Sequence, residues 1–406
     1  MHRAVSPLPF PAGTMLFRSF ASTIVLSAVV LLAAAATAAD PAAAQPQAPD
    51  GRAVLTGTVV DAETGEPLPG VNVFIAVSMR GTATSPDGRF RLEVPLGAHR
   101  LYVSSVGYEA EARNLNLREA RVYTFEFKLT PAVIEGEEVV VEAERDRKWQ
   151  ERYDRFVDAF IGETPNAEQA EIQNPEVVSF DGGVGELEAF ASEPLVIVNR
   201  ALGYRITYHL KDFRLLPNRT QYDGEPLFEE LDGTPAEKAQ WAEARREAFL
   251  GSFHHLLLAM IADKVEPQGF KLFLRPNSGP PSGSQASAGG SMMQMGGQRY
   301  PISVDEIMKP GEIQVEQVLD FNGVVEVVYL GERQTEAYAR WRQQFSGGGM
   351  MRSRAPRYQT SQFWLERGPA TIDYKGDIVD PYGVTVSGYF AYERVGDQLP
   401  KEYRPR

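Results

Sequence analysis

Residues 54–94 read VLTGTVVDAETGEPLPGVNVFIAVSMRGTATSPDGRFRLEV, and this stretch decides the fold of the N-terminal part of the chain. Apolar and polar residues alternate in its strand-like runs, as in RFRLEV at 89–94, which is the pattern of a strand with one buried face. Turn chemistry separates the runs, since SPDG at 85–88 places proline and glycine where a tight turn requires them. Short strands divided by turns predict an all-β sandwich over residues 52–130, with one buried and one solvated face on each strand.

Six short motifs occur in order along this region. They are GTVVD at 57–61, TGEPLPGV at 64–71, GTAT at 81–84, DGRF at 87–90, PLG at 95–97 and VGY at 106–108. In these motifs the region resembles the carboxypeptidase regulatory-like domain, a transthyretin-like sandwich of secreted proteins of the Bacteroidota and Rhodothermota. The resemblance implies a transthyretin- or Ig-like sandwich without catalytic residues of its own. In that family the domain lies beside a zinc peptidase or in front of an outer-membrane receptor.

The first 38 residues have the three parts of a secretory signal peptide. Two arginines precede an apolar stretch at 20–36, and Ala36-Thr37-Ala38 supplies small residues at a cleavage site. Translation from Met15 is an alternative start, and an uncleaved membrane anchor is the alternative interpretation. Because the stretch is short for a span of about 20 residues, we expect cleavage, a linker at 39–51 and no integral membrane span afterwards. The expected location is the periplasm or the outer-membrane surface of a Gram-negative bacterium.

Composition excludes several classes of protein. The chain has 406 residues, a formal net charge of −13 and no cysteine. Without cysteine there is no disulfide framework, no thiolate zinc site and no cysteine nucleophile. The acidic balance argues against nucleic acid as a partner.

An acidic linker at 131–147 leads to residues 148–406, where helix and strand signals do not alternate regularly. This predicts an α+β domain with a mostly antiparallel sheet, so that the chain as a whole is multidomain. Two stretches at 276–300 and 346–356 are rich in glycine and serine, and we expect them to form exposed, mobile loops. Strands are predicted at 177–180, 187–191, 194–199, 204–209, 270–274, 315–319, 324–330, 363–365, 370–374 and 384–389.

Three helices are predicted in this domain. The first ends at Gly162 and carries an aromatic stripe with helical spacing, Trp149, Tyr153, Phe156 and Phe160. We expect the stripe to pack on its own domain, and a docking face for a partner is the alternative. The second helix begins at Thr234 with a capping box and a proline and runs to about Lys264. The third runs from about Arg333 to Phe345.

The histidines of the sequence do not form a zinc-binding motif. Beyond the signal peptide the histidines are His99, His209, His254 and His255, and none begins an H-x-x-E or H-E-x-x-H motif. His209 and Asp212 are the only candidate pair, and their odd offset on a strand would point them to opposite faces. His254 and His255 are neighbours on a helix, about 100° apart, and would not share a metal. The sequence therefore predicts no catalytic, cofactor-binding or metal residues and no cofactor.

These observations favour an exported cell-envelope protein with a binding or structural accessory role and no catalytic activity of its own. The expected partner is another envelope protein or a surface polymer. The alternative is a hydrolase that acts on glycan or peptide through Asp or Glu of the C-terminal domain, because such an enzyme needs only two carboxylates and the chain has 54 acidic residues. A fragment of an outer-membrane receptor is disfavoured by the length of chain that remains after the sandwich.

Deletion of residues 1–38 should leave a soluble, folded protein, because the removed segment serves only export. N-terminal sequencing of the protein recovered from envelope fractions should begin at Ala39. Recovery of the intact leader would contradict cleavage.

Overall fold

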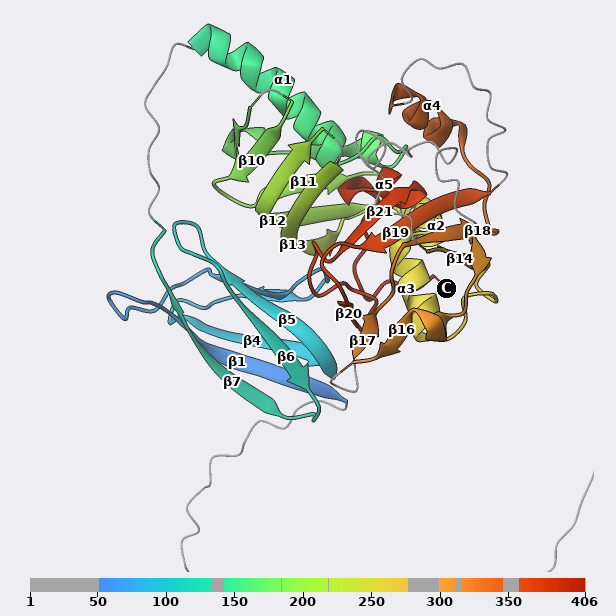
Figure 1. Ribbon diagram of the computed structural model, residues 1–406. Helices are drawn as coiled ribbons and strands as arrows, with labels where there is room; N and C mark the ends of the chain where they lie inside the picture. Colours follow the sequence, from blue (N-terminus) through green and yellow to red (C-terminus); the bar gives the residue numbers. More distant parts are fainter. Residues whose placement is uncertain are drawn as a thin grey trace, which may run out of the picture. The chain divides into compact units, whose positions relative to one another are not determined.

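The computed structural model describes residues 51–132, 142–183, 185–217, 219–276, 299–311, 316–345 and 358–405 (Figure 1). All of them belong to one unit of connected contacts, residues 46–406. The predicted signal peptide, most of the linker at 39–51, much of the linker at 131–147 and nearly all of the two predicted loops lie outside the described residues.

The N-terminal part is the predicted sandwich of two sheets. One sheet has the strand order β4-β1-β7, and the other has the order β3-β2-β5-β6. The strands are β1 (Arg52–Asp61), β2 (Asn72–Ile75), β3 (Gly81–Ala83), β4 (Arg89–Pro95), β5 (Gly97–Ser104), β6 (Glu111–Leu117) and β7 (Val122–Leu129). β1 runs parallel to β7, whereas the other pairs are antiparallel. Alternate apolar side chains, among them Leu55, Val73 and Leu101, fill the space between the sheets.

One expectation about the sandwich is wrong. Strands β2 and β5 do not have a solvated second face, because Phe74 is 0% exposed and Tyr102 is 5% exposed on the side away from the sandwich core. The C-terminal region covers this outer face of the β3-β2-β5-β6 sheet. Alternation along a strand shows which residues share a face, but it does not show that a second domain covers the polar-looking side.

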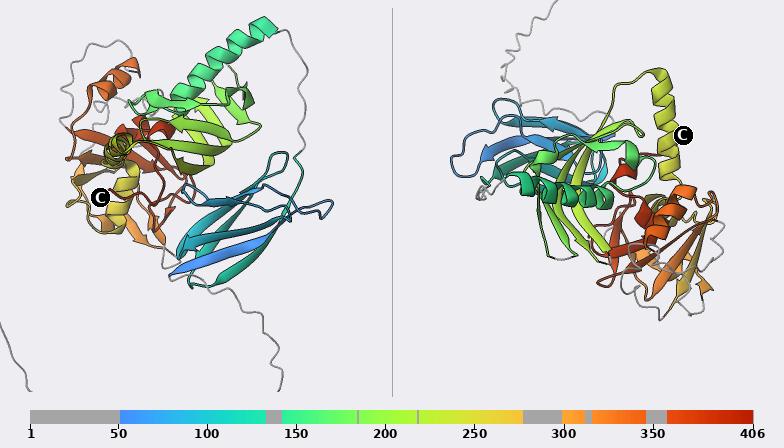
Figure 2. Two further views of the ribbon diagram at one scale, coloured as in Figure 1. Left: turned by 180° about the vertical axis from the view of Figure 1, so that it is seen from behind. Right: turned by 90° about the horizontal axis from the view of Figure 1, so that it is seen from above.

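The chain continues with a helix, α1 (Glu142–Phe160), and a six-stranded sheet with the order β8-β11-β12-β10-β9, in which β13 pairs with β12. Its strands are β8 (Ala170–Ile172), β9 (Val178–Asp181), β10 (Leu187–Ala191), β11 (Leu195–Asn199), β12 (Tyr204–Leu216) and β13 (Arg219–Glu230). Figure 2 shows α1 lying along this sheet. Its aromatic stripe packs on the sheet, since Phe156 contacts Phe180 and Phe213, which confirms packing on its own domain.

A third group of strands forms the rest of the C-terminal region. A five-stranded sheet has the order β15-β14-β18-β19-β21, and a smaller sheet has the order β16-β17-β20. The strands are β14 (Phe270–Arg275), β15 (Tyr300–Pro301), β16 (Met308–Pro310), β17 (Glu316–Leu319), β18 (Val324–Tyr329), β19 (Gln359–Leu365), β20 (Ala370–Asp373) and β21 (Val384–Gly388). The helices α4 (Glu336–Phe345) and α5 (Tyr389–Tyr392) flank them. The described pairs in these sheets are antiparallel, as predicted for the α+β domain.

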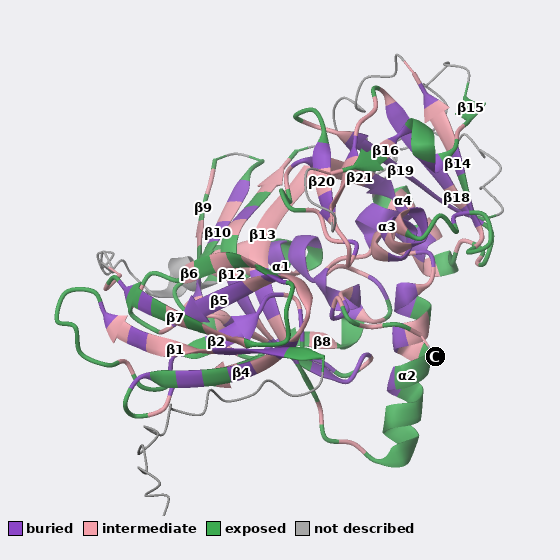
Figure 3. Ribbon diagram, turned by 90° about the horizontal axis from the view of Figure 1, so that it is seen from below, coloured by how far each residue is buried: buried purple, intermediate pink, exposed green. Residues whose placement is uncertain are grey.

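The predicted long helix at 234–264 is two helices, α2 (Pro235–Phe249) and α3 (Phe253–Ile261). The capping box of Thr234 and Glu237 is present as predicted. The break falls at Gly251, whose φ of +80° lies outside the helical region and is one that residues with a side chain rarely adopt. Much of α2 is exposed, whereas α3 is largely buried (Figure 3). Among the described residues no helix combines the length and the apolar character that crossing a membrane requires.

Substitution Gly57→Ala should lower the free energy of unfolding by about 2 kcal/mol, because overpacking a well-packed site typically has such a cost. A methyl group at this position would lie 2.2 Å from Phe125 O and 2.7 Å from the Phe90 ring. Gly183→Ala is the matched control, since a methyl group there meets nothing within 4 Å. Urea unfolding of both variants measures the difference, and equal stability would contradict the close approach of β1 and β7.

Candidate functional site

The surface where the sandwich meets the C-terminal region is centred on three rings. His209 of β12 stacks on Phe74 of β2 with ring centroids 5.1 Å apart, and it also contacts Tyr102 of β5. The Ser104 hydroxyl lies 3.2 Å from His209 Nδ1. Burial lowers the pKa of His209 to about 4, and nearby Lys211 acts in the same direction. His209 is therefore a neutral, mostly aromatic element of the contact.

Main-chain hydrogen bonds fasten the loop after β2 to the C-terminal region. Val77 N donates to Pro226 O at 2.8 Å, and Phe228 N donates to Ser78 O at 2.9 Å. Lys401 N donates to Val77 O at 2.9 Å. This loop thus adds a short parallel bridge to the edge of β13.

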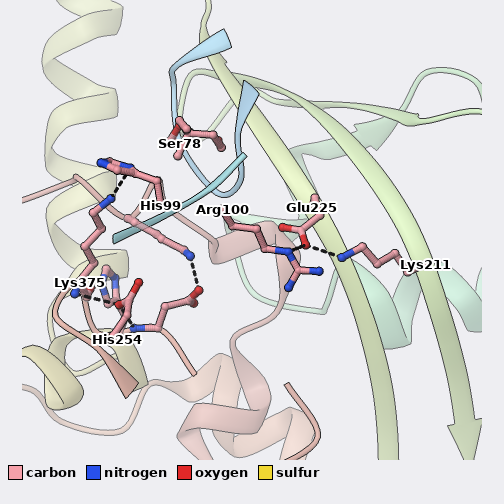
Figure 4. A network of polar contacts seen from close by, with 11 residues as sticks. Ser78, His99, Arg100, Lys211, Glu225, His254 and Lys375 are labelled. Atoms are coloured by element: carbon pink, nitrogen blue, oxygen red, sulfur yellow. Dashed lines mark hydrogen bonds and ion pairs between the residues drawn. The ribbon is translucent and has the colours of Figure 1, made fainter. Parts of the chain in front are cut away.

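A buried ion pair lies beside the rings. Arg100 of β5 and Lys211 of β12 both contact the carboxylate of Glu225, with 2.9 Å between Arg100 Nε and Glu225 Oε1 (Figure 4). Because the Glu225 side chain is only 5% exposed, loss of both cations would leave an uncompensated buried charge. The ion pair ties the sandwich to β12 and β13.

A cavity of about 480 Å³ lies next to these contacts, and it is lined by both parts of the chain. The sandwich contributes residues of β5 and β6, and the C-terminal region contributes residues of β13, of the turn after β20 and of the C-terminal segment. A second cavity of about 340 Å³ adjoins the first, and the two share seven lining residues: Val77, Tyr222, Asp377, Ile378, Pro381, Gln398 and Lys401. A volume of this size is that of a typical ligand pocket.

His99 and Lys375 form the most unusual pair in the cavity. His99 Nε2 lies 2.7 Å from Pro95 O, and since a carbonyl only accepts, Nε2 carries the proton. His99 Nδ1 then accepts from Lys375 Nζ at 3.0 Å (Figure 4). Burial, with a contribution from Lys375, lowers the pKa of His99 to about 4, and burial lowers the pKa of Lys375 to about 8. The cavity therefore holds a neutral imidazole and an amine whose pKa is lowered to about 8.

The turn after β20 brings acids to the same cavity. Asp373 accepts hydrogen bonds from the main-chain N–H groups of Lys375 and Asp377, at 2.9 and 3.0 Å. Lys401 forms an ion pair with Asp377. Burial raises the pKa of Asp373. Acidic and basic side chains thus alternate along this wall.

The four histidines contact different partners and do not form a common site. His209 packs on the sandwich, whereas Asp212 accepts from Tyr382, so the two do not share a ligand site. The argument from regular alternation does not hold there, because the β12–β13 register shifts between Leu210 and Asp212. His254 Nε2 donates to Lys375 O, while His255 contacts Gly251 and Gln268. Within the described part of the chain, no three His, Asp or Glu side chains are arranged to hold a metal ion.

Sequence reasoning missed the residues that line the cavity, including Arg100, Glu225, Lys375 and Lys401. They come from segments far apart in the chain, and each is an ordinary charged residue on a strand or turn. The one available signal was His99, a histidine within a predicted strand of the sandwich.

The pH dependence of stability should change in the variant His209→Phe, which keeps a ring on Phe74 and cannot titrate. The unfolded histidine binds a proton below pH 6.5, whereas the folded one does so only near pH 4. Between pH 7 and pH 4 the wild type should therefore lose on the order of 3 kcal/mol more than the variant. Urea unfolding across this range measures the difference, and parallel curves would contradict a buried neutral His209.

Comparison with known families gives one match. Residues 55–141 match the CarboxypepD_reg-like domain, a regulatory-like and not a catalytic domain. No curated protein matched the chain.

Solved structures resemble the chain only in part. Catechol 1,2-dioxygenase from Acinetobacter sp. ADP1 is 17% identical, with a TM-score of 0.18, and the match covers 25% of this chain and 59% of that one, less than two thirds of its length. The 5-hydroxyisourate hydrolase of Klebsiella pneumoniae is 19% identical, with a TM-score of 0.17, over 21% of this chain and 99% of that one. The minor pilin GBS52 of Streptococcus agalactiae is 16% identical, with a TM-score of 0.18, over 22% and 48%. These scores carry no functional argument, and the conclusion rests on the family match: the chain carries a carboxypeptidase regulatory-like domain at residues 55–141.

Proposed function

We propose that the protein is an exported cell-envelope binding or structural accessory protein without catalytic activity of its own. The observation that carries the proposal is the burial of Phe74 and Tyr102 on the outer face of the sandwich. Ring contacts, main-chain hydrogen bonds and a buried ion pair fix the sandwich to the C-terminal region. The sandwich forms one binding unit with the C-terminal region, and the cavity between them is built by both.

The signal-like N-terminus supports a place in the periplasm or at the outer-membrane surface. The partner in this proposal is another envelope protein or a surface polymer. A preformed cavity with side chains already fixed by mutual contacts suits binding, because little ordering remains to oppose association.

A specific observation also keeps the hydrolase alternative. The 480 Å³ cavity is lined by five carboxylates, Asp223, Glu225, Glu316, Asp373 and Asp377. Burial raises the pKa of Asp373, which is the direction needed by a general acid. A glycosidase needs two such groups at a suitable separation.

The variant Phe74→Asp should release the sandwich from the C-terminal region, because a charge would replace a ring that is 0% exposed in the contact. We expect the wild-type chain, cross-linked in cells, to retain a defined set of envelope proteins or polymers, and Phe74→Asp to retain at least tenfold less of them. Thr124→Asp, on an exposed position of β7, is the control and should behave like the wild type. Mass spectrometry and glycan analysis of the cross-linked material provide the measurement.

Equal retention by wild type and Phe74→Asp would contradict the proposal. The same preparations are incubated with peptidoglycan, capsular glycan and casein. Hydrolysis that disappears in Asp373→Asn would replace the binding proposal with the hydrolase.

A further inference from the structure

Strand β13 lies at an edge of its sheet. In the described part of the chain its ladder partner is β12 alone, apart from the single bridge between Leu227 and Ser78. That bridge uses Pro226 O and Phe228 N, so the main-chain groups of these two residues point away from β12. Proline suits such an outward position, because it has no N–H to offer. The edge is thus already used for strand addition at one end.

The same edge continues into the 480 Å³ cavity. The register shift places its extra residue, Lys211, on β12, whereas β13 pairs residue by residue without interruption. Main-chain groups therefore alternate in direction along β13, and those of Gly224 and Tyr222 point the same way as those of Pro226 and Phe228. Both residues line the cavity. Among the described residues no main-chain hydrogen bond outside the β12–β13 ladder reaches Gly224 or Tyr222. Two pairs of unoccupied groups therefore face the cavity at the spacing of a β-ladder.

Gly224 allows β12 to pack closely against β13 beside the cavity. A methyl group there would lie 2.2 Å from Tyr208 Cε1 and 2.6 Å from His209 O. Without a side chain at 224, the cavity reaches the ring of Tyr208, which is only 2% exposed and yet lines the cavity wall. A glycine at such a point is typical of close approach by another backbone.

Amide side chains line the remaining walls. Asn114 and Asn116 come from β6, and Gln398 comes from the C-terminal segment. Gln398 Oε1 is buried and has no hydrogen-bond partner within the described residues. An unpaired buried acceptor is unfavourable unless a bound group or water satisfies it. Amides both donate and accept, which matches the groups of a peptide main chain.

The charge of the cavity favours a basic occupant. Five carboxylates line it, against the three cations Arg100, Lys375 and Lys401. Two of the cations are engaged within the protein, since Arg100 contacts Glu225 and Lys401 contacts Asp377. Lys375 contacts His99, and Lys211, which lies beside the cavity, pairs with Glu225 and Asp223. These four cations leave one carboxylate in excess, and this negative charge would meet a positive side chain of the occupant.

We propose that an extended peptide segment with a basic side chain binds in this cavity as an added strand, pairing with the main chain of Tyr222 and Gly224. This recognition mode draws affinity from main-chain bonds and specificity from the flanking side chains. The inference rests on the proposed function in that it takes the partner to be a protein. Free ladder groups two residues apart favour a peptide over a glycan, which has no main-chain ladder to offer.

The test uses the full chain and a set of acetylated, amidated pentapeptides with lysine at the centre and threonine, valine or serine at the other positions. Fluorescence polarisation measures binding, and hydrogen exchange followed by mass spectrometry measures protection of fragments that span residues 219–228. We expect binding with slowed exchange in these fragments, and unchanged exchange in fragments of β11. Methylation of the central peptide nitrogens should weaken binding at least tenfold, because it removes ladder donors.

Two substitutions test whether peptide binding at this edge is specific. Replacement of the central lysine by glutamate should weaken binding about tenfold, and Asp223→Asn should reduce that preference. Asp305→Asn is the matched control, since Asp305 is exposed and lies outside the cavity lining. The control should keep the full preference for lysine.

Three results would overturn the proposal: no pentapeptide binds, methylation leaves binding unchanged, or a pool of cellobiose, chitobiose and mannobiose protects residues 219–228 while the peptides do not. Failure here is distinct from failure of the proposed function. If no pentapeptide binds while Phe74→Asp still loses its cross-linked partners, the accessory role is supported and strand addition is excluded. If the peptides bind while Phe74→Asp keeps its partners, the edge binds peptide but the docked sandwich is not needed.

Discussion

The contact of Phe74 and Tyr102 with His209 is the constraint on which the rest of the arrangement depends. Rings on the outer face of a sandwich strand would be exposed in a free-standing domain, and exposed aromatic patches of this kind are rare in soluble proteins unless they serve contact. Once they are buried, the loop after β2 reaches the edge of β13, and Arg100 reaches Glu225. The cavity then follows as the space that the two curved surfaces do not fill. Each feature of the site is thus a consequence of covering one sheet face.

Most charged side chains of the site pair with one another, whereas a metal site or a nucleophile needs charged groups that are free to act on a ligand. Arg100 engages Glu225 across the contact with the sandwich, whereas Lys401 engages Asp377 within the C-terminal region. The histidines are hydrogen-bonded to fixed partners. Such groups hold geometry, and the acids that line the cavity outnumber the cations. The cavity also leaves neutral groups without a partner among the described residues: the outward main-chain edge of β13 and the side-chain oxygen of Gln398. This chemistry is suited to recognition through shape and hydrogen bonds.

The sandwich could be derived from the sequence because its signals are local. Alternation in β4 and the turn at 85–88 act within a few residues, and both appear in the structure. Strand β13 was missed because polar residues occupy both of its faces, and its partners lie outside the reach of a local pattern. The break at Gly251 was missed because one glycine within an apolar helical pattern is weak evidence for a stop. The cavity could not be foreseen, since its lining residues meet only after two separately folded surfaces dock.

The parallel pairing of β1 with β7 has a mechanical consequence. The ladder runs from Val54 opposite Val122 to Asp61 opposite Leu129, eight pairs in the same direction. Tension applied between the chain entering β1 and the chain leaving β7 would slide the two strands past each other instead of peeling them apart. All eight pairs would carry the load together, and rupture would require them to fail at once. A tether at one end of the sandwich could therefore transmit a pull to the remainder of the chain without opening this domain first.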